Sequence, residues 1–144
     1  DNGLPSIGLR PYVVYGPGRD QGMTSGPTMA MLAAARGEPY AIGYGGTAQY
    51  DFAPDVARAF VTAASAELEG AAVYNAPGAV ASMGDVVATI RRVVPGADIT
   101  WSGDPLPFPP ELEAAGFDRD VGAFPRTPLD VGVAATIEHF RAAA

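Results

Sequence analysis

The sequence predicts an α/β fold, and three observations support this prediction. Short apolar stretches rich in β-branched and aromatic residues alternate with segments of helical periodicity along the 144 residues. Hydrophobic residues make up 48% of the chain and charged residues only 17%, which is typical of a chain with a packed core. Neither an internal repeat nor a low-complexity tract interrupts the alternation. A chain of this length suits one domain with one compact core.

The first predicted strand runs from Ser6 to Tyr15 and ends at the turn Gly16-Pro17-Gly18. It is rich in β-branched and aromatic residues, and glycine and proline terminate regular structure. Residues 19–25 are polar and are expected to form a loop. A short helix is then expected to begin with Ser25 as its cap and Pro27 in its first turn, and to end near Gly37.

The middle of the chain repeats the order of strand, turn and helix. Residues 40–42 indicate a brief strand, and residues 43–46 indicate a glycine turn. Residues 49–52 are expected to lead into a helix that Pro54 opens. This helix is expected to pack through Val56, Phe60 and Ala63.

The last part of the chain adds two strands and two helices. Strands are expected at residues 72–75 and 97–101, and residues 105–110 are expected to form an extended, proline-rich loop. Ser82 to Asp85 has the pattern of a capping box, and Thr127 to Asp130 has the same pattern before the final helix. The first of these two helices is expected to pack through Val86, Val87, Ile90 and Val94.

Charge and composition argue against several classes of function. The net charge of −7 should repel nucleic acids and anionic membrane surfaces, and no apolar run reaches the roughly 18 residues of a membrane span. We therefore expect a soluble, cytoplasmic protein with neither nucleic-acid nor membrane partners. The sequence has no cysteine and only one histidine, His139, so no metal site is expected. All nine basic residues are arginine, which leaves no lysine for a Tyr-x-x-x-Lys proton relay.

Two further features bear on function. The sequence starts at Asp1 rather than at methionine and soon enters a strand pattern, so we interpret it as a processed or excised piece; a trimmed tag would give the same start. Residues 9–18 predict a strand that ends in Gly-Pro-Gly at the carboxyl edge of a parallel sheet, where open α/β folds bind ligands. The alternative interpretation is an ordinary buried strand with a tight turn.

The order of these motifs resembles the extended short-chain dehydrogenase/reductase family, the NAD-dependent epimerases and dehydratases. The matching segments are Leu9 to Gly18, Gly45-Gly46, Asp55 to Ala59, Tyr74-Asn75 and Pro125 to Gly132, and the resemblance extends over essentially the whole chain. The resemblance implies the C-terminal part of a Rossmann-like fold, with the last parallel strands and a small α/β substrate-binding subdomain. It places residues 1–18 in the Rossmann-like sheet and residues 19–144 in the substrate-binding subdomain.

The same resemblance implies that catalytic parts lie outside this sequence. Family members bind their dinucleotide through an N-terminal Gly-x-x-Gly-x-x-Gly turn and move a proton with a Tyr-x-x-x-Lys pair, and this sequence contains neither. We therefore expect no catalytic residue here and no turnover by the isolated chain. NAD or NADP would be held mainly by an N-terminal Rossmann half, which is the partner that the resemblance implies.

The resemblance also suggests which residues meet the ligands. Pro11, Tyr12 and Val13 would line the nicotinamide end of the cofactor, although all three are equally ordinary strand residues. Arg19 carries a guanidinium group that suits an anionic substrate. Many nucleotide-sugar members carry an arginine near Thr47 or Ala48, and its absence argues against such a substrate. The residues expected to contact the substrate are Tyr15, Gly16, Arg19, Tyr44, Gln49 and Tyr50.

Two functional hypotheses follow from the sequence. The first is the substrate-binding half of an NAD(P)-dependent epimerase, dehydratase or dehydrogenase that acts on a small polar, sugar-like molecule. The second is a free-standing, non-enzymatic small-molecule binding or interaction module on the same scaffold. The sequence leaves open the substrate, the choice between the two cofactors, and the oligomeric state.

Overall fold

The computed structural model describes residues 4–143. Its strands are β1 (Ser6–Arg10), β2 (Val13–Tyr15), β3 (Tyr40–Ile42), β4 (Thr47–Phe52), β5 (Ala71–Asn75), β6 (Ala79–Ser82) and β7 (Ile99–Trp101). Its helices are α1 (Gly26–Arg36), α2 (Ala53–Ala64), α3 (Met83–Val93), the short α4 (Ala115–Phe117), a π-helical turn η1 (Asp118–Gly122) and α5 (Leu129–Ala142). The α/β class predicted from the sequence is confirmed.

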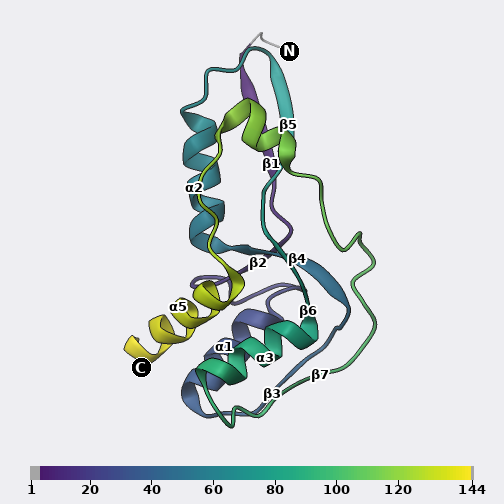
Figure 1. Cartoon of the computed structure of the whole chain (residues 1–144), viewed down its shortest axis with the longest axis vertical. Coiled ribbons are helices and arrows are strands. Elements are labelled where there is room, and N and C mark those ends of the chain that lie inside the picture. The colour runs from purple at the N-terminus through teal and green to yellow at the C-terminus, as the bar shows by residue number, and fades with distance from the viewer. Residues whose placement is uncertain (1–3, 144) are drawn as a thin grey trace.

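The strands form three small sheets in an elongated molecule (Figure 1). β1 pairs in parallel with β5, and these strands lie with α2 at one end of the molecule. β3 pairs in parallel with β7 at the other end, beside α1 and α3. Between the two ends, β4 pairs in parallel with β2 and antiparallel with β6. Parallel pairs need long crossover connections, and the helices supply them.

The expected single strand from Ser6 to Tyr15 is wrong, because the chain breaks into β1 and β2, which belong to different sheets. Pro11 has no N–H to give to a sheet. The next N–H, that of Tyr12, donates to the Asp51 carboxylate over 2.6 Å instead of to a strand carbonyl. The break therefore places one run of apolar residues in two different sheets.

Strands β4 and β6 were missed by the sequence prediction. Residues 49–52 were expected only to lead into a helix, but β4 is a six-residue strand whose Tyr50 lies opposite Ala79 of β6. Gln49 and Asp51 interrupt its apolar pattern, yet both are almost fully buried. Their side chains are accommodated by hydrogen bonds with distant segments, which the local pattern does not reveal.

The main core lies between the β2–β4–β6 sheet and the helices α1, α3 and α5. Val86, Val87 and Ile90 of α3 are fully buried, as the sequence predicted. The capping box of α3 is also confirmed, because the Ser82 hydroxyl accepts the Asp85 N–H and the Asp85 carboxylate accepts the Ser82 N–H. The start of α3 is thus determined by its own capping box, and the rest of the helix is stabilised by packing in the core.

Of the other two predicted caps, one has the right position and one is wrong. Ser25 is the N-cap residue of α1, but its hydroxyl donates to the Gly22 carbonyl over 2.9 Å and makes no capping hydrogen bond. The N-cap residue of α5 is Pro128 rather than Thr127. Thr127 gives its N–H and its hydroxyl to the Asp55 carboxylate, over 2.6 and 3.1 Å, so it ties the start of α5 to the start of α2. The expected packing of α2 also fails at Phe60, whose side chain is 51% exposed.

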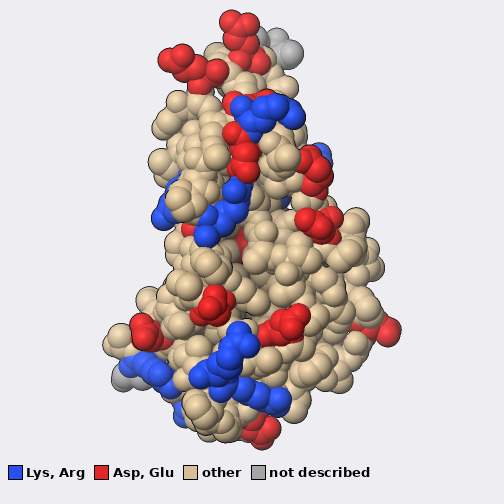
Figure 2. Space-filling view, in the orientation of Figure 1, with Lys and Arg blue, Asp and Glu red and all other residues tan. Residues whose placement is uncertain are grey.

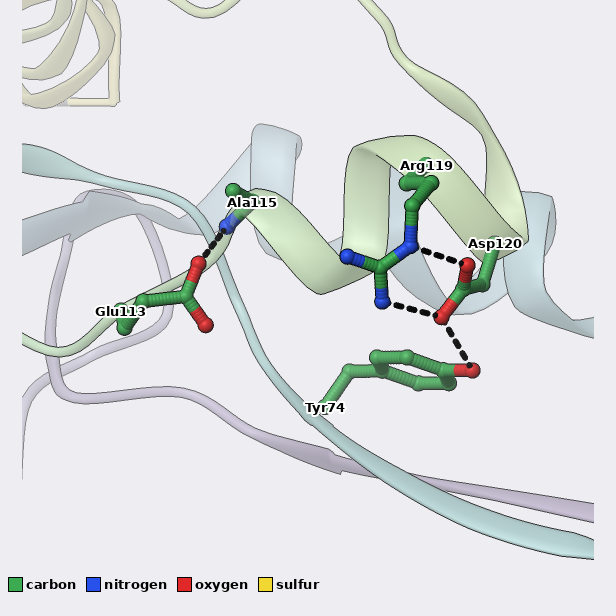
Figure 3. Close-up of polar contacts among 5 residues, drawn as sticks. All are labelled: Tyr74, Glu113, Ala115, Arg119 and Asp120. Carbon is green, nitrogen blue, oxygen red and sulfur yellow. Dashed lines mark hydrogen bonds and ion pairs between the residues drawn. The ribbon is translucent and has the colours of Figure 1, made fainter.

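The α4–η1 segment contacts β5 partly through an exposed cluster of polar side chains (Figure 3). The Asp120 carboxylate accepts two hydrogen bonds from the Arg119 guanidinium and one from the Tyr74 hydroxyl. These bonds lower the pKa of Asp120, with Arg119 as the main cause. The Tyr74 hydroxyl links the segment to the strand, and the buried ring of Phe117, which meets Tyr74 edge to face, packs it there.

Candidate functional site

A buried polar network lies where the chain crosses between the two ends of the molecule. The Asp51 carboxylate accepts the Tyr12 N–H over 2.6 Å and a Gln49 amide N–H over 2.8 Å. The same Gln49 nitrogen donates to the Ala76 carbonyl over 2.8 Å, and the Gln49 oxygen accepts the Leu112 N–H over 3.2 Å. This Asp51–Gln49 network therefore joins the chain after β1, the chain after β5, strand β4 and the proline-rich segment.

Asp51 is 1% exposed, and burial raises the pKa of its carboxyl group. The hydrogen bonds from Tyr12 and Gln49 act in the opposite direction and favour the charged form. Both carboxyl oxygens serve as acceptors, which is the pattern of a carboxylate rather than of a carboxylic acid. Gln49 was predicted to contact the substrate. In this structure its amide nitrogen and its oxygen both form hydrogen bonds with other residues of the chain.

A cavity of about 430 Å³ lies between the loop after β2, the turn after β3 and the loop after β7. Of the six residues predicted to contact the substrate, only Tyr44 lines this cavity. The lining residues are Gly22, Met23, Ser25, Gly26, Tyr40, Gly43, Tyr44 and Asp104 to Pro107. The contribution of the loop after β7 was missed, because nothing local in a proline-rich loop indicates where it packs. We call this the tyrosine-lined cavity.

Arg19 holds one wall of this cavity in place. Its guanidinium group donates to the Gln21 carbonyl and, over 3.0 Å, to the Thr24 hydroxyl. The Tyr44 hydroxyl donates to the Thr24 carbonyl over 3.5 Å. Burial raises the pKa of Tyr44, whereas the positive charge of Arg19 lowers it. Arg19 therefore organises the loop and contributes a positive charge near the cavity.

Two of the predicted substrate contacts are core side chains in this structure. Tyr15 is buried, and its ring packs against Phe52 at a centroid distance of 5.4 Å. Tyr50 is 2% exposed, and among residues 4–143 its hydroxyl finds no hydrogen-bond partner. Burial raises the pKa of Tyr50 to about 12, and the neighbouring Tyr12 adds to the effect. Gly16 is buried too, and its N–H donates to the Thr28 hydroxyl over 3.1 Å.

These buried phenols predict a steep loss of stability at high pH. Tyrosine in an unfolded chain titrates near pH 10, whereas the folded pKa of Tyr50 is about 12. Above pH 10 the folded state therefore holds more protons than the unfolded state, so the free energy of unfolding should fall as the pH rises. Denaturant titrations at increasing pH should show this fall, and Tyr50→Phe should reduce its slope. Ionisation of all six tyrosines while the protein stays folded would contradict it.

The three residues predicted to contact the cofactor differ in how much of their side chains is accessible to solvent. Pro11 and Tyr12 are half-buried and follow directly after the carboxyl end of β1. The Tyr12 hydroxyl donates to the Pro109 carbonyl over 2.6 Å, and its ring meets Phe108 edge to face. Val13 is 1% exposed and belongs to the core. The side-chain surface that a cofactor would meet here comes from Pro11 and Tyr12.

Other kinds of site find little support in the described part of the chain. Residues 4–143 contain no cluster of histidine and acidic side chains suited to hold a metal ion. None of their helices combines the length and the apolar character that crossing a bilayer requires. Figure 2 shows acidic and basic side chains interspersed on the drawn face, with broad uncharged areas between them.

Solved structures with the same fold were found among sugar-nucleotide and amino-acid enzymes. "MoeE5 in complex with UDP-glucuronic acid and NAD" is 26% identical, with a TM-score of 0.77 over 96% of this chain and 48% of that one. The UDP-glucose 4-epimerase of Thermus thermophilus, in complex with NAD, is 22% identical, with a TM-score of 0.77 over 96% and 47%. A partial consensus L-threonine 3-dehydrogenase is 22% identical, with a TM-score of 0.81 over 93% and 48%.

The chain thus spans about half the length of the solved structures it matches. No curated protein matches its sequence. The model of the NAD dependent epimerase/dehydratase family matches residues 1–76, which is more than half of the chain and includes β1, β2, β4 and β5. This chain belongs to the NAD-dependent epimerase/dehydratase family.

Proposed function

We propose that this chain is the substrate-binding half of an NAD(P)-dependent epimerase, dehydratase or dehydrogenase. The observation that carries the proposal is the joining of two parallel strands at their carboxyl ends by the Asp51–Gln49 network. Ligands of open α/β sheets bind at this edge. The network fixes Tyr12 after β1 and Ala76 after β5, and it adds the segment that contains Leu112.

In this proposal the cofactor is NAD or NADP, and its nicotinamide meets Pro11 and Tyr12. Val13 contributes through its backbone, because its side chain is in the core. The bound nicotinamide would accept or return a hydride, which is chemistry that no amino-acid side chain supplies. The residues of this chain would orient the ring and exclude water from it, and they include no proton-transferring Tyr-x-x-x-Lys pair.

An N-terminal Rossmann half would supply the remaining parts. Among the described residues, β1 pairs with a strand on one side only, and its other edge is free to extend a sheet. A cavity of about 410 Å³ next to β1 and α2 is lined by Pro5, Ile7 and the exposed Phe60, among others. The free edge and this apolar cavity together suit a packed strand and helix. We also propose that the protein is cytoplasmic and that residues 1–18 belong to the Rossmann-like sheet and residues 19–144 to the substrate-binding subdomain.

The proposed substrate is a small polar, sugar-like molecule that occupies the tyrosine-lined cavity. Two of the similar structures hold or act on UDP-sugars, which supports this class. Thr47 and Ala48 provide no positive charge for a diphosphate, so the recognised part is proposed to be the sugar-like group itself. Arg19 would serve it by holding the cavity wall and by presenting its positive charge.

Replacing Arg19 with alanine tests this proposal. In a protein that joins this chain to a Rossmann half, Arg19→Ala should weaken substrate binding by about 1–3 kcal/mol, because a charged hydrogen bond and the loop brace are lost. Cofactor affinity should stay nearly unchanged, since the other half holds most of the nucleotide. Isothermal titration of each ligand measures both values.

Arg36→Ala is the matched control, because it removes an arginine from the last turn of α1, away from the cavity lining. Equal substrate affinity in Arg19→Ala and Arg36→Ala would refute the assignment of the loop. Substrate binding without any cofactor binding in the joined protein would instead favour a non-enzymatic binding module.

A further inference from the structure

Asp51 is an unusual residue at the centre of the crossing point. Its side chain is 1% exposed, and its carboxylate has no arginine partner among the ion pairs of residues 4–143. Taking a carboxylate out of water costs free energy, which neutral hydrogen-bond donors only partly offset. The two neutral donors here are Tyr12 N–H and the Gln49 amide. The bonds of Asp51 thus fix geometry more effectively than they add stability.

The position of the carboxylate is tightly restricted. Gly78 faces it so closely that a Cβ atom there would overlap the Asp51 Oδ1 atom. On the other side, the Asp51 Oδ2 atom is held by the Tyr12 N–H over 2.6 Å. The Asp51 carboxylate therefore has a fixed position, and its hydrogen bond from the Tyr12 N–H fixes the chain after β1 relative to it.

The alignment extends to the proline-rich segment. The Tyr12 hydroxyl donates to the Pro109 carbonyl, and the Gln49 oxygen accepts the Leu112 N–H. Pro109 and Leu112 lie two and five positions beyond Pro107, the last of the residues Asp104 to Pro107 that line the tyrosine-lined cavity. Tyr12 and one wall of the cavity are consequently connected through a single set of hydrogen bonds.

We propose that Asp51 is a positioning residue that holds Tyr12 at the place where it meets the cofactor and aligns it with the substrate cavity. This inference rests on the proposed function, because it takes Tyr12 to face the nicotinamide. Asp51 does not touch the reacting atoms in this role. It acts through the backbone of Tyr12 and through Gln49, and a misplaced Tyr12 would slow the reaction more than it would weaken binding.

Amide hydrogen exchange in the chain with Asp51→Asn tests the alignment directly. Asparagine keeps the shape of the side chain but offers a neutral acceptor to Tyr12 and turns an N–H₂ group toward Gln49. Exchange at the Tyr12 amide should become about tenfold faster. The control is Asp85→Asn, which removes a carboxylate that also accepts a backbone N–H, but at the start of α3. It should speed exchange at Ser82 and leave Tyr12 unchanged.

Unchanged Tyr12 exchange in Asp51→Asn would overturn the proposal. If Asp51→Asn does not fold, Gln49→Met replaces it, since methionine matches glutamine in length and lacks the amide. Exchange should then rise at both Leu112 and Tyr12, because the carboxylate loses its second donor. A response at Leu112 alone would show that Asp51 is not a shared fixed point, and it would overturn the proposal too.

A kinetic measurement addresses the consequence for the reaction. In the protein that joins this chain to a Rossmann half, Asp51→Asn should lower kcat about tenfold while the Kd of the cofactor changes less than about threefold. Faster Tyr12 exchange with unchanged kcat would refute the positioning role. If the parent joined protein shows no cofactor-dependent turnover, the proposed function is wrong, and the exchange result alone then decides whether Asp51 holds Tyr12.

Discussion

Gly78→Ala should destabilise the protein by about 3 kcal/mol, because a side chain at this position has no space. Its Cβ would overlap the Asp51 carboxylate and lie 2.8 Å from the Tyr50 carbonyl oxygen. Neither group moves easily, since Tyr50 belongs to the β4 backbone and Asp51 is bonded to Tyr12. Urea unfolding followed by circular dichroism measures the loss, and amide exchange at Tyr12 should become faster in the same variant.

Gly43→Ala is the control for this substitution. A Cβ at Gly43 meets no atom within 4 Å, so this variant should change the free energy of unfolding by less than about 0.5 kcal/mol. Equal stability of the two variants would show that the crossing point is loosely packed. This result would argue against the Asp51–Gln49 network as the feature that fixes the position of Tyr12.

Gly132→Ala should destabilise the protein by about 1–2 kcal/mol, although alanine favours helices. Alanine in place of glycine inside α5 gains about 1 kcal/mol of helix propensity, whereas overpacking in a core costs about 1–3 kcal/mol. Here the added Cβ would overlap the Tyr15 hydroxyl and lie 3.0 Å from its ring carbon. Tyr15 is buried beside Phe52, so its ring cannot move aside. Overpacking should therefore exceed the gain in propensity.

A double variant separates the two contributions. Tyr15→Phe removes the hydroxyl oxygen that the Cβ added by Gly132→Ala would overlap. Gly132→Ala should therefore lower the free energy of unfolding less in the Tyr15→Phe background than in the parent. The ring carbon still lies close, so the recovery should be partial. An increase in stability on Gly132→Ala in the parent protein would contradict the packing of α5 against Tyr15.

Local sequence signals predicted the helices better than the strands. Helix α3 carries its capping box and its apolar period within a dozen residues, and both are found in the structure. The start of α5 carries a similar pattern, but Thr127 bonds to Asp55 of another helix instead. The prediction failed there because a partner 72 positions away in the sequence competes with the local cap. Strand β4 was missed because its buried polar residues depend on partners 27, 39 and 63 positions away.

The candidate site shows the same division between local and distant information. Tyr44, in the turn after β3, was expected to contact the substrate, and it lines the tyrosine-lined cavity. Gln49, however, was expected to face a substrate, and its partners Ala76 and Leu112 lie 27 and 63 positions away. A polar residue in a sequence predicts a hydrogen-bonding need, but it does not say whether a ligand or the protein itself meets that need.

We propose that this chain supplies one side of an NAD(P)-dependent site whose cofactor-binding and proton-transferring parts lie on a Rossmann half. The most direct test follows the nicotinamide absorbance of the isolated chain, and of the same chain joined to such a half, with sugar-like substrates and either cofactor. We expect no turnover by the isolated chain, which has no lysine and no Gly-x-x-Gly-x-x-Gly turn, and cofactor-dependent turnover by the joined protein. Turnover by the isolated chain, or a joined protein that folds yet neither binds nor uses the cofactor, would contradict the claim.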